Sequence, residues 1–312
     1  MKILFITSSR IGDAVLSSGL LAHIEASYPQ ARVTIACGPL VQSLFEGYPL
    51  LDRVIPLKKE RRNGHWVKLW QGVIGTRWDI VIDLRDSAVS RLIWGREKHI
   101  FSRRIDKQQH KAKQCADVMG LADVPAPKLW FADAQVEKAR AIIPDGAPVL
   151  GVGPTANWIG KTWPVERFIE VMRYMLDTHM KGARVAVFGA PGEEADAYTL
   201  YNALPEDRCI DCIAKGSPGE AAAMIARMDF YIGNDSGLMH CAAAAGVKTL
   251  GLFGPSYDLI YAPYGQDFIR TPESFDELID FEGYDAASLD RSLMTSLSVE
   301  AVKAKLDDMF KP

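Results

Sequence analysis

Apolar residues along the chain gather in short runs, and longer segments with helical spacing separate these runs. The run KILFIT at residues 2–7 predicts a first strand, and residues 13–27 predict a helix that ends before Pro29. Further strands are predicted at 32–37, 53–57 and 79–84. Strands that are apolar almost throughout are typical of a parallel sheet covered on both faces.

A second series of the same kind begins after AIIPDGAP (141–148), whose prolines and glycine mark it as a linker. It predicts strands at 149–154, 184–189, 229–235 and 248–254, and helices at 164–180, 193–204, 218–228 and 236–245. Alternation that begins twice predicts an α/β protein with two doubly wound domains facing each other across a cleft. We expect these domains at 1–145 and 146–297, with 298–312 forming a C-terminal helix that packs back on the body.

Length and composition agree with two globular domains. The chain has 312 residues, 48% of them hydrophobic, and no apolar run approaches the roughly 20 residues of a membrane span. The apolar run before Thr7 is too short for the core of a signal peptide. We therefore expect a cytoplasmic protein, or one on the inner face of the cytoplasmic membrane.

The five cysteines are too few and too scattered for a disulfide framework. Cys209 and Cys212 have the C-x-x-C spacing of redox and zinc sites, but no second pair accompanies them. The surrounding RCIDCIA reads as a strand, so we interpret both cysteines as structural.

Basic residues are concentrated in one part of the chain. Residues 51–115 contain sixteen Lys and Arg against seven Asp and Glu, although the whole chain has a net charge of −3. Each of these residues taken alone fits a solvated helix face. Together they indicate an anionic partner: nucleic acid, acidic lipid or a phosphorylated glycan.

The triplet Gly160-Lys161-Thr162 resembles the end of a phosphate-binding P-loop, but the loop is incomplete. A P-loop needs four residues between its first glycine and Gly160-Lys161, and Thr155 stands where that glycine should be. Lys161 nevertheless follows the first strand of the second domain and precedes a helix that starts at Pro164. In this position a lysine can meet a diphosphate as a point charge, assisted by the helix N-terminus.

Acidic residues follow two other strands. Asp13, after Gly12, opens the first helix, where it can be a helix cap or a general base at the carboxyl end of a strand. Glu193 and Glu194 follow a glycine-bracketed turn, where they can oppose a helix dipole or accept hydrogen bonds from a ribose diol.

The segment YIGNDSGLMH (231–240) takes a strand directly into a helix. Gly237 permits close approach of the backbone, and the helix N-terminus offers N–H donors to a phosphate. His240 lies five residues after Asp235, on the same turn.

Three segments together resemble a known family. TSSRIGDAVLSSGLL, WIGKTWPVERF and GNDSGLMHCAAAAGVKTLGLFGPS, in this order and spacing, are similar to the signatures of glycosyltransferase family 9, the ADP-heptose:lipopolysaccharide heptosyltransferases and their relatives. The resemblance extends over about 250 residues, from the first strand to Ser256. It implies a GT-B fold of two Rossmann-like domains, with the acceptor on the first and a nucleotide-sugar donor on the second. It also implies an inverting, metal-independent transfer without a cofactor.

The resemblance also assigns roles to individual residues. Asp13 matches the catalytic base, and Lys161 matches the lysine that contacts the donor diphosphate and acts in catalysis. Asp235, Ser236, Gly237 and His240 match the loop that holds the donor, and Glu193 matches an acidic donor contact for which Glu194 is the alternative. We add Gly12, Thr155 and Thr162 as positions of the phosphate and backbone loops.

The donor sugar and the acceptor stay open at this point. ADP-heptose is the donor that the resemblance implies, and the basic region 51–115 fits a phosphorylated, Kdo-bearing lipid A core or another anionic glycan. We expect no nucleic acid partner. An NAD-dependent oxidoreductase would need a third glycine after Gly151 and Gly153, which is missing, and a non-catalytic binding protein would leave Asp13, Lys161 and Asp235 without a role.

Overall fold

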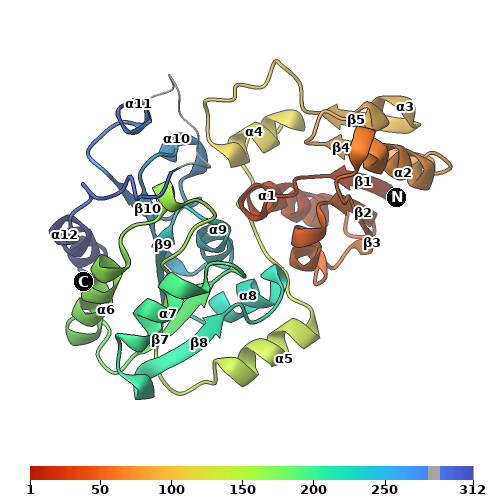
Figure 1. Cartoon of the computed structure of the whole chain (residues 1–312). Helices are drawn as coiled ribbons and strands as arrows, with labels where there is room; N and C mark the ends of the chain where they lie inside the picture. The colour runs from red at the N-terminus through yellow and green to blue at the C-terminus, as the bar shows by residue number, and fades with distance from the viewer. Residues whose placement is uncertain (280–288, 312) are drawn as a thin grey trace. The chain divides into compact units, whose positions relative to one another are not determined.

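The computed structural model describes residues 1–279 and 289–311 and divides the chain into two compact units (Figure 1). The first comprises Met1–Glu137 with Ser217–Ala223, and the second Lys138–Gly216 with Met224–Pro312. The first boundary lies inside helix α5 (Asp133–Ile142), whereas the sequence placed it after this helix, at 145. The expected second domain, 146–297, includes residues 280–288, which lie outside the described residues.

The first unit is built on a five-stranded parallel sheet with the strand order β3-β2-β1-β4-β5. Its strands are β1 (Lys2–Ile6), β2 (Arg32–Cys37), β3 (Leu51–Pro56), β4 (Trp78–Asp83) and β5 (Gly95–Ile100). Its helices, apart from α5, are α1 (Ile11–Ser27), α2 (Gly64–Val73), α3 (Ala88–Leu92) and α4 (Lys111–Val118). Alternation along β1 sends Leu4 and Ile6 into one core cluster with residues of α2 and α3. Helices α1 and α4 pack against each other (Figure 1).

The second unit is built on a six-stranded parallel sheet with the order β11-β10-β9-β6-β7-β8. Its strands are β6 (Val149–Gly153), β7 (Arg184–Gly189), β8 (Cys209–Ile213), β9 (Phe230–Asn234), β10 (Lys248–Phe253) and β11 (Asp267–Arg270). Its helices are α6 (Val165–Asp177), α7 (Glu194–Asn202), α8 (Pro218–Ile225, shared with the first unit), α9 (Gly237–Ala244), α10 (Asp258–Tyr261), α11 (Phe275–Leu278) and α12 (Val299–Met309).

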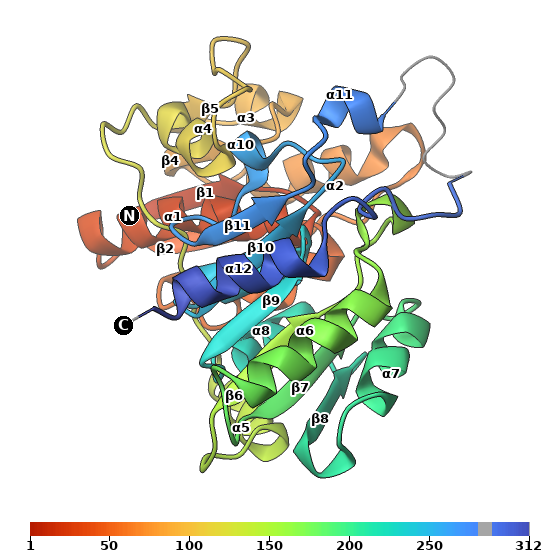
Figure 2. The ribbon, with the colours of Figure 1, turned by 90° about the vertical axis from the view of Figure 1, so that its left-hand side faces the viewer.

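The C-terminal helix belongs to the core of the second unit. In α12, Val302 and Leu306 are fully buried in one cluster with Phe168 and Val171 of α6. Figure 2 shows α12 crossing beside α6 over the strands of this sheet. The amphipathic pattern at 298–310 thus reports a helix that packs against its own unit.

Two strands were absent from the sequence prediction. β5, with the sequence GREKHI, and β11, with the sequence DFIR, both lie at the edge of their sheets. An edge strand has only one strand neighbour and keeps much of its surface in water, so its residues need not be apolar. β5 therefore appeared in the sequence only as part of the basic region.

A glycine on β6 makes room for a large side chain on β9. Tyr231 is fully buried, and a Cβ added at Gly153 would lie 2.1 Å from its hydroxyl oxygen. That hydroxyl has no hydrogen-bond partner among the described residues. Any side chain at position 153 must therefore displace the end of the tyrosine.

We expect Gly153→Ala to lower the free energy of unfolding by about 1–3 kcal/mol, the usual cost of overpacking a filled interior. The double variant Gly153→Ala, Tyr231→Phe lacks the hydroxyl that the new methyl group meets, so it should recover most of this loss. Urea unfolding measures all three proteins. A single variant as stable as the wild type would contradict the packing described here.

Candidate active site

The strand order reverses once in each sheet, and the candidate residues follow the strands at which it reverses. β1 lies between β2 and β4, and β6 lies between β9 and β7. In open parallel sheets, ligands bind at the carboxyl ends of the strands beside such a reversal, where successive helices leave to opposite faces. Asp13 follows β1, and Lys161 follows β6.

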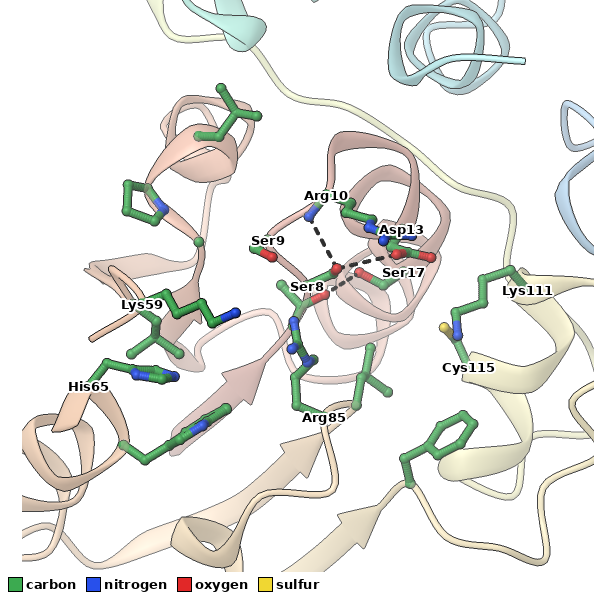
Figure 3. Close-up of a pocket in the computed structure, with 18 of the residues that line it drawn as sticks. Ser8, Ser9, Arg10, Asp13, Ser17, Lys59, His65, Arg85, Lys111 and Cys115 are labelled. Atoms are coloured by element: carbon green, nitrogen blue, oxygen red, sulfur yellow. Dashed lines mark hydrogen bonds between the residues drawn. The ribbon is translucent and has the colours of Figure 1, made fainter. Parts of the chain in front are cut away.

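In the first unit, a pocket of about 710 Å³ opens at the carboxyl ends of the strands (Figure 3). Every strand of the sheet contributes to its lining through the segment that follows it. Among the lining residues are Ser8 and Asp13 after β1, Gly38 after β2, Lys59 and His65 after β3, Arg85 after β4, and Phe101 and Lys111 after β5. The five parallel strands thus bring together side chains that are far apart in the sequence.

Asp13 lines this pocket from the first turn of α1. The N-cap position is Arg10, so the interpretation of Asp13 as the cap residue was wrong, and Asp13 is the third residue of the helix. Its Oδ2 accepts a hydrogen bond of 3.3 Å from the Ser8 hydroxyl, and its Oδ1 is buried without a partner among the described residues. The carboxylate therefore keeps most of its acceptor capacity unused.

Lysine and arginine side chains and the imidazole of His65 surround the carboxylate. Figure 3 shows Lys59 and His65 on one side of the pocket and Lys111 on the other, with Arg85 between them. All four belong to the basic region 51–115. The pocket thus combines one carboxylate with a wall that favours anionic ligands.

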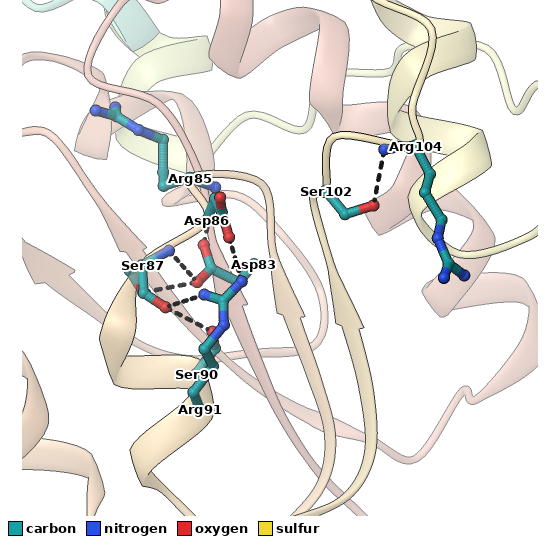
Figure 4. Close-up of polar contacts among 8 residues, drawn as sticks. All are labelled: Asp83, Arg85, Asp86, Ser87, Ser90, Arg91, Ser102 and Arg104. Carbon is teal, nitrogen blue, oxygen red and sulfur yellow. Dashed lines mark hydrogen bonds and ion pairs between the residues drawn. The ribbon is translucent and has the colours of Figure 1, made fainter.

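A buried carboxylate fixes the turn that carries Arg85 (Figure 4). Asp83, at the end of β4, is fully buried and accepts hydrogen bonds from the backbone N–H of Arg85 and of Ser87, each 2.8 Å long. The Ser87 hydroxyl donates a third, of 2.6 Å, to the same carboxylate. Because a buried carboxylate must be satisfied in this way, the turn has little freedom, and Arg85 enters the pocket from a fixed backbone.

In the second unit, a lysine, a carboxylate and an imidazole meet at the carboxyl ends of β6 and β9. The Lys161 ammonium lies 2.5 Å from Oδ2 of Asp235, and His240 Nε2 lies 3.8 Å from Oδ1 of the same carboxylate. Asp235 and His240 are buried, whereas Lys161 is partly exposed. Asp235 therefore pairs with the lysine, whose side chain stays partly exposed.

Asn234 orders the loop that carries Lys161, a role that the sequence analysis missed. Its fully buried amide donates to the Pro154 carbonyl at 2.8 Å and accepts from the Trp163 backbone N–H at 3.0 Å. One side chain at the end of β9 thus binds both ends of the segment that follows β6. Asn234 precedes Asp235, so the same strand end positions both members of the ion pair.

The remaining candidate residues of the second unit lie near these strand ends. Glu193 is the N-cap residue of α7, while Glu194 accepts a hydrogen bond from the Gly192 N–H at 2.8 Å. Ser236 is the N-cap residue of α9, and Gly237 is its first residue. Thr155 and Thr162 are buried in the loop after β6. Gly12, in the first unit, is the second residue of α1.

A family model matches the part of the chain that contains the second and third sequence signatures. Residues 66–282 match the family model described as glycosyltransferase family 9 (heptosyltransferase). The chain belongs to glycosyltransferase family 9. It is therefore a glycosyltransferase, and the resemblance read from the sequence is confirmed.

Curated relatives in this family are similar over most of their length. Lipopolysaccharide heptosyltransferase 2 of Escherichia coli K12 is 25% identical over 293 residues, which cover 82% of this chain and 83% of the relative. Lipooligosaccharide heptosyltransferase 2 of Haemophilus influenzae is 27% identical over 301 residues, which cover 82% of this chain and 84% of the relative.

Solved structures of family 9 glycosyltransferases share the fold. The family 9 glycosyltransferase of Veillonella parvula superposes with a TM-score of 0.79 at 22% identity, covering 99% of this chain and 97% of the other. E. coli ADP-heptose lps heptosyltransferase II gives a TM-score of 0.76 at 20% identity, covering 99% and 98%. The expected GT-B fold of two Rossmann-like domains is confirmed.

Three further observations on this family 9 protein concern metal ligands, membrane spans and a thiol in the pocket. Among residues 1–279 and 289–311, no group of three or more His, Cys, Asp and Glu side chains is placed to hold a metal ion. No helix in the same part of the chain is long and apolar enough to cross a membrane. One thiol, Cys115, lines the pocket, and burial raises its pKa to about 12, with a smaller contribution from Asp13 in the same direction and an opposing one from Lys111.

We expect the Cys115 thiol to resist alkylation in the folded protein at pH 8, because a thiol with so high a pKa is almost entirely protonated and only the thiolate is nucleophilic. Iodoacetamide treatment followed by peptide mass spectrometry checks this, with the protein in urea as the control in which Cys115 should react. Rapid labelling of Cys115 in the native protein would contradict the burial described here.

Proposed function

We infer that this protein transfers a heptose from ADP-heptose to a lipopolysaccharide core acceptor of the lipid A type. The observation that carries the proposal is the placement of Asp13, with unused acceptor capacity, among cationic side chains at the reversal point of the first sheet. The relatives suggest the sugar and the acceptor class, because they are lipopolysaccharide and lipooligosaccharide heptosyltransferases. One solved relative is described as a heptosyltransferase with ADP.

The pocket of the first unit is the proposed acceptor site. Lys59, Arg85 and Lys111 would bind carboxylate or phosphate groups of the acceptor, and Asp13 would face the hydroxyl that reacts. A Kdo-bearing lipid A core carries such anionic groups. An acceptor of this kind would bring the protein to the inner face of the cytoplasmic membrane, where the basic region 51–115 meets anionic headgroups.

The strand ends of the second unit are the proposed donor site. The Lys161 ammonium and the N-terminus of α9, with Ser236 and Gly237, would bind the diphosphate. For the acidic contact, Glu193 is favoured over Glu194, because the latter already accepts the Gly192 N–H. Asp235 and His240 would hold the lysine in position for this contact.

The proposed reaction is a direct displacement with inversion. Asp13 takes the proton of the acceptor hydroxyl, and the hydroxyl oxygen forms a bond to the anomeric carbon of the donor. The bond from that carbon to the diphosphate oxygen breaks on the opposite face, and ADP leaves with the electron pair. Lys161 and the α9 N-terminus stabilise the negative charge that develops on the leaving group, the role that a divalent cation fills in other enzymes. The transfer is accordingly proposed to be metal-independent.

We expect Asp13→Asn to lower kcat by about 10²–10⁴, the usual contribution of a general base, with little change in the affinity for ADP. The exposed Asp123 of the same unit provides the matched control, and Asp123→Asn should keep full activity. Release of ADP from ADP-heptose in the presence of acceptor measures the rate. Near-normal turnover in Asp13→Asn would remove this residue from the mechanism.

ADP should raise the midpoint of thermal unfolding by about 2–4 °C at a hundred times its Kd, the concentration at which binding adds about 2.7 kcal/mol to stability. We expect the shift to persist in EDTA and to be largely lost in Lys161→Met, each protein being compared with its own ligand-free midpoint. Lys181→Met, at an exposed position of the same unit, is the control. An unchanged ADP shift in Lys161→Met, or a shift with NAD and none with ADP, would contradict the donor site.

A further inference from the structure

The outer surface of helices α2 and α3 exposes large apolar side chains. Val67, Ile74, Leu92 and Trp94 are 54%, 41%, 66% and 53% exposed, and together they are called the α2–α3 patch. All four lie within 28 consecutive positions of the first unit. Single exposed apolar residues are common on protein surfaces, but several on adjoining elements mark a surface that binds something.

Helices α2 and α3, which contact each other, carry Val67, Ile74 and Leu92. Leu69 and Val73 point from α2 into the core, which leaves Val67 and Ile74 on the flank of the same helix. The other flank is next to β3, because the Arg53 guanidinium donates to the Gly72 carbonyl at 3.0 Å. The apolar flank therefore turns toward α3, with which α2 is in contact.

Pairing of β4 with β5 completes the patch. Trp78 pairs with Gly95, so the residues before them, Arg77 and Trp94, emerge side by side at the amino ends of these strands. Leu92 is the last residue of α3, and the next residue, Ile93, is buried in the core. The core cluster beneath α2 and α3 does not include the four residues of the patch. Packing of the core therefore does not explain why these four residues are apolar.

The stretch of chain that carries the patch is rich in basic residues, although two of them, Lys59 and Arg85, line the pocket instead. Residues 58–98 contain ten Lys and Arg against five Asp and Glu, and one of these acids, Asp83, is fully buried. Arg91 is paired with Asp86 on the surface (Figure 4), but no ion pair or hydrogen bond of the described residues involves the side chain of Arg77 or Arg96. Arg96 lies two residues after Trp94 in the chain, and Arg77 lies next to Trp94 at the amino ends of the paired strands.

We propose that the α2–α3 patch docks the protein on an anionic phospholipid bilayer. The interfacial region of the bilayer would take up the four apolar side chains, Val67, Ile74, Leu92 and Trp94, because amphipathic tryptophan rings are enriched there. Arg77 and Arg96 would contact lipid phosphates. A second copy of this chain fits less well, because a two-fold contact through the patch would bring Arg77 and Arg96 of both copies into one small interface. The inference rests on the proposed function only for the identity of the membrane that the protein binds.

Sedimentation of the full-length protein with vesicles tests the docking. The vesicles contain phosphatidylcholine alone or phosphatidylcholine with phosphatidylglycerol, and neither acceptor nor nucleotide is present, so the result does not depend on heptose transfer. We expect binding to the anionic vesicles, weakened by salt. The double variant Leu92→Ser, Trp94→Ser should lower the partition coefficient about tenfold or more, and Arg77→Gln, Arg96→Gln should lower it about tenfold.

A matched control comes from the second unit, where Leu259 is 77% exposed and lies outside any basic cluster of comparable size. Leu259→Ser should bind vesicles as the wild type does. Equal binding to neutral vesicles, no vesicle binding, or wild-type binding by both double variants would overturn the proposal. So would concentration-dependent dimerisation of the wild type that Leu92→Ser, Trp94→Ser abolishes, because the patch would then be an interface between copies.

Discussion

Parallel pairing with a single reversal of strand order is the constraint on which both sites depend. Because all strands of a sheet run the same way, the segments after them meet at one edge, and the reversal at β1 and at β6 opens space between the departing helices. This geometry places Asp13 after β1 and Lys161 after β6, at the edge of each sheet where ligands bind. The first two family 9 signatures follow β1 and β6, at the strand ends where open parallel sheets bind their ligands.

Burial of polar groups then fixes the side chains at those edges. Asp83 and Asn234 are fully buried, and each binds the backbone of the segment that carries a cationic site residue, Arg85 in one unit and Lys161 in the other. A buried polar group without partners is costly, so these hydrogen bonds leave the two segments little choice of conformation. The flexible cations are thereby presented from rigid loops, which reduces the entropy lost when they bind an anion.

Sequence reasoning placed the candidate residues directly after predicted strands, because apolar runs and the residues after them are local features. It named Asp13, Lys161 and Asp235 as candidates, although it left open a capping role for Asp13 that the helix start at Ile11 excludes. It missed the polar edge strands β5 and β11, whose residues need little apolar character. The role of Asn234 also escaped it, because its partners lie more than 70 positions away and only the fold brings them together.

The central claim is a direct displacement on ADP-heptose by an acceptor hydroxyl in the pocket of the first unit. NMR of the product formed from ADP-heptose and a Kdo-bearing lipid A acceptor, with EDTA present throughout, tests it most directly. The account predicts one added heptose whose anomeric configuration is opposite to that of the donor. Retention of configuration, or a product that forms only when a divalent metal is restored, would contradict it.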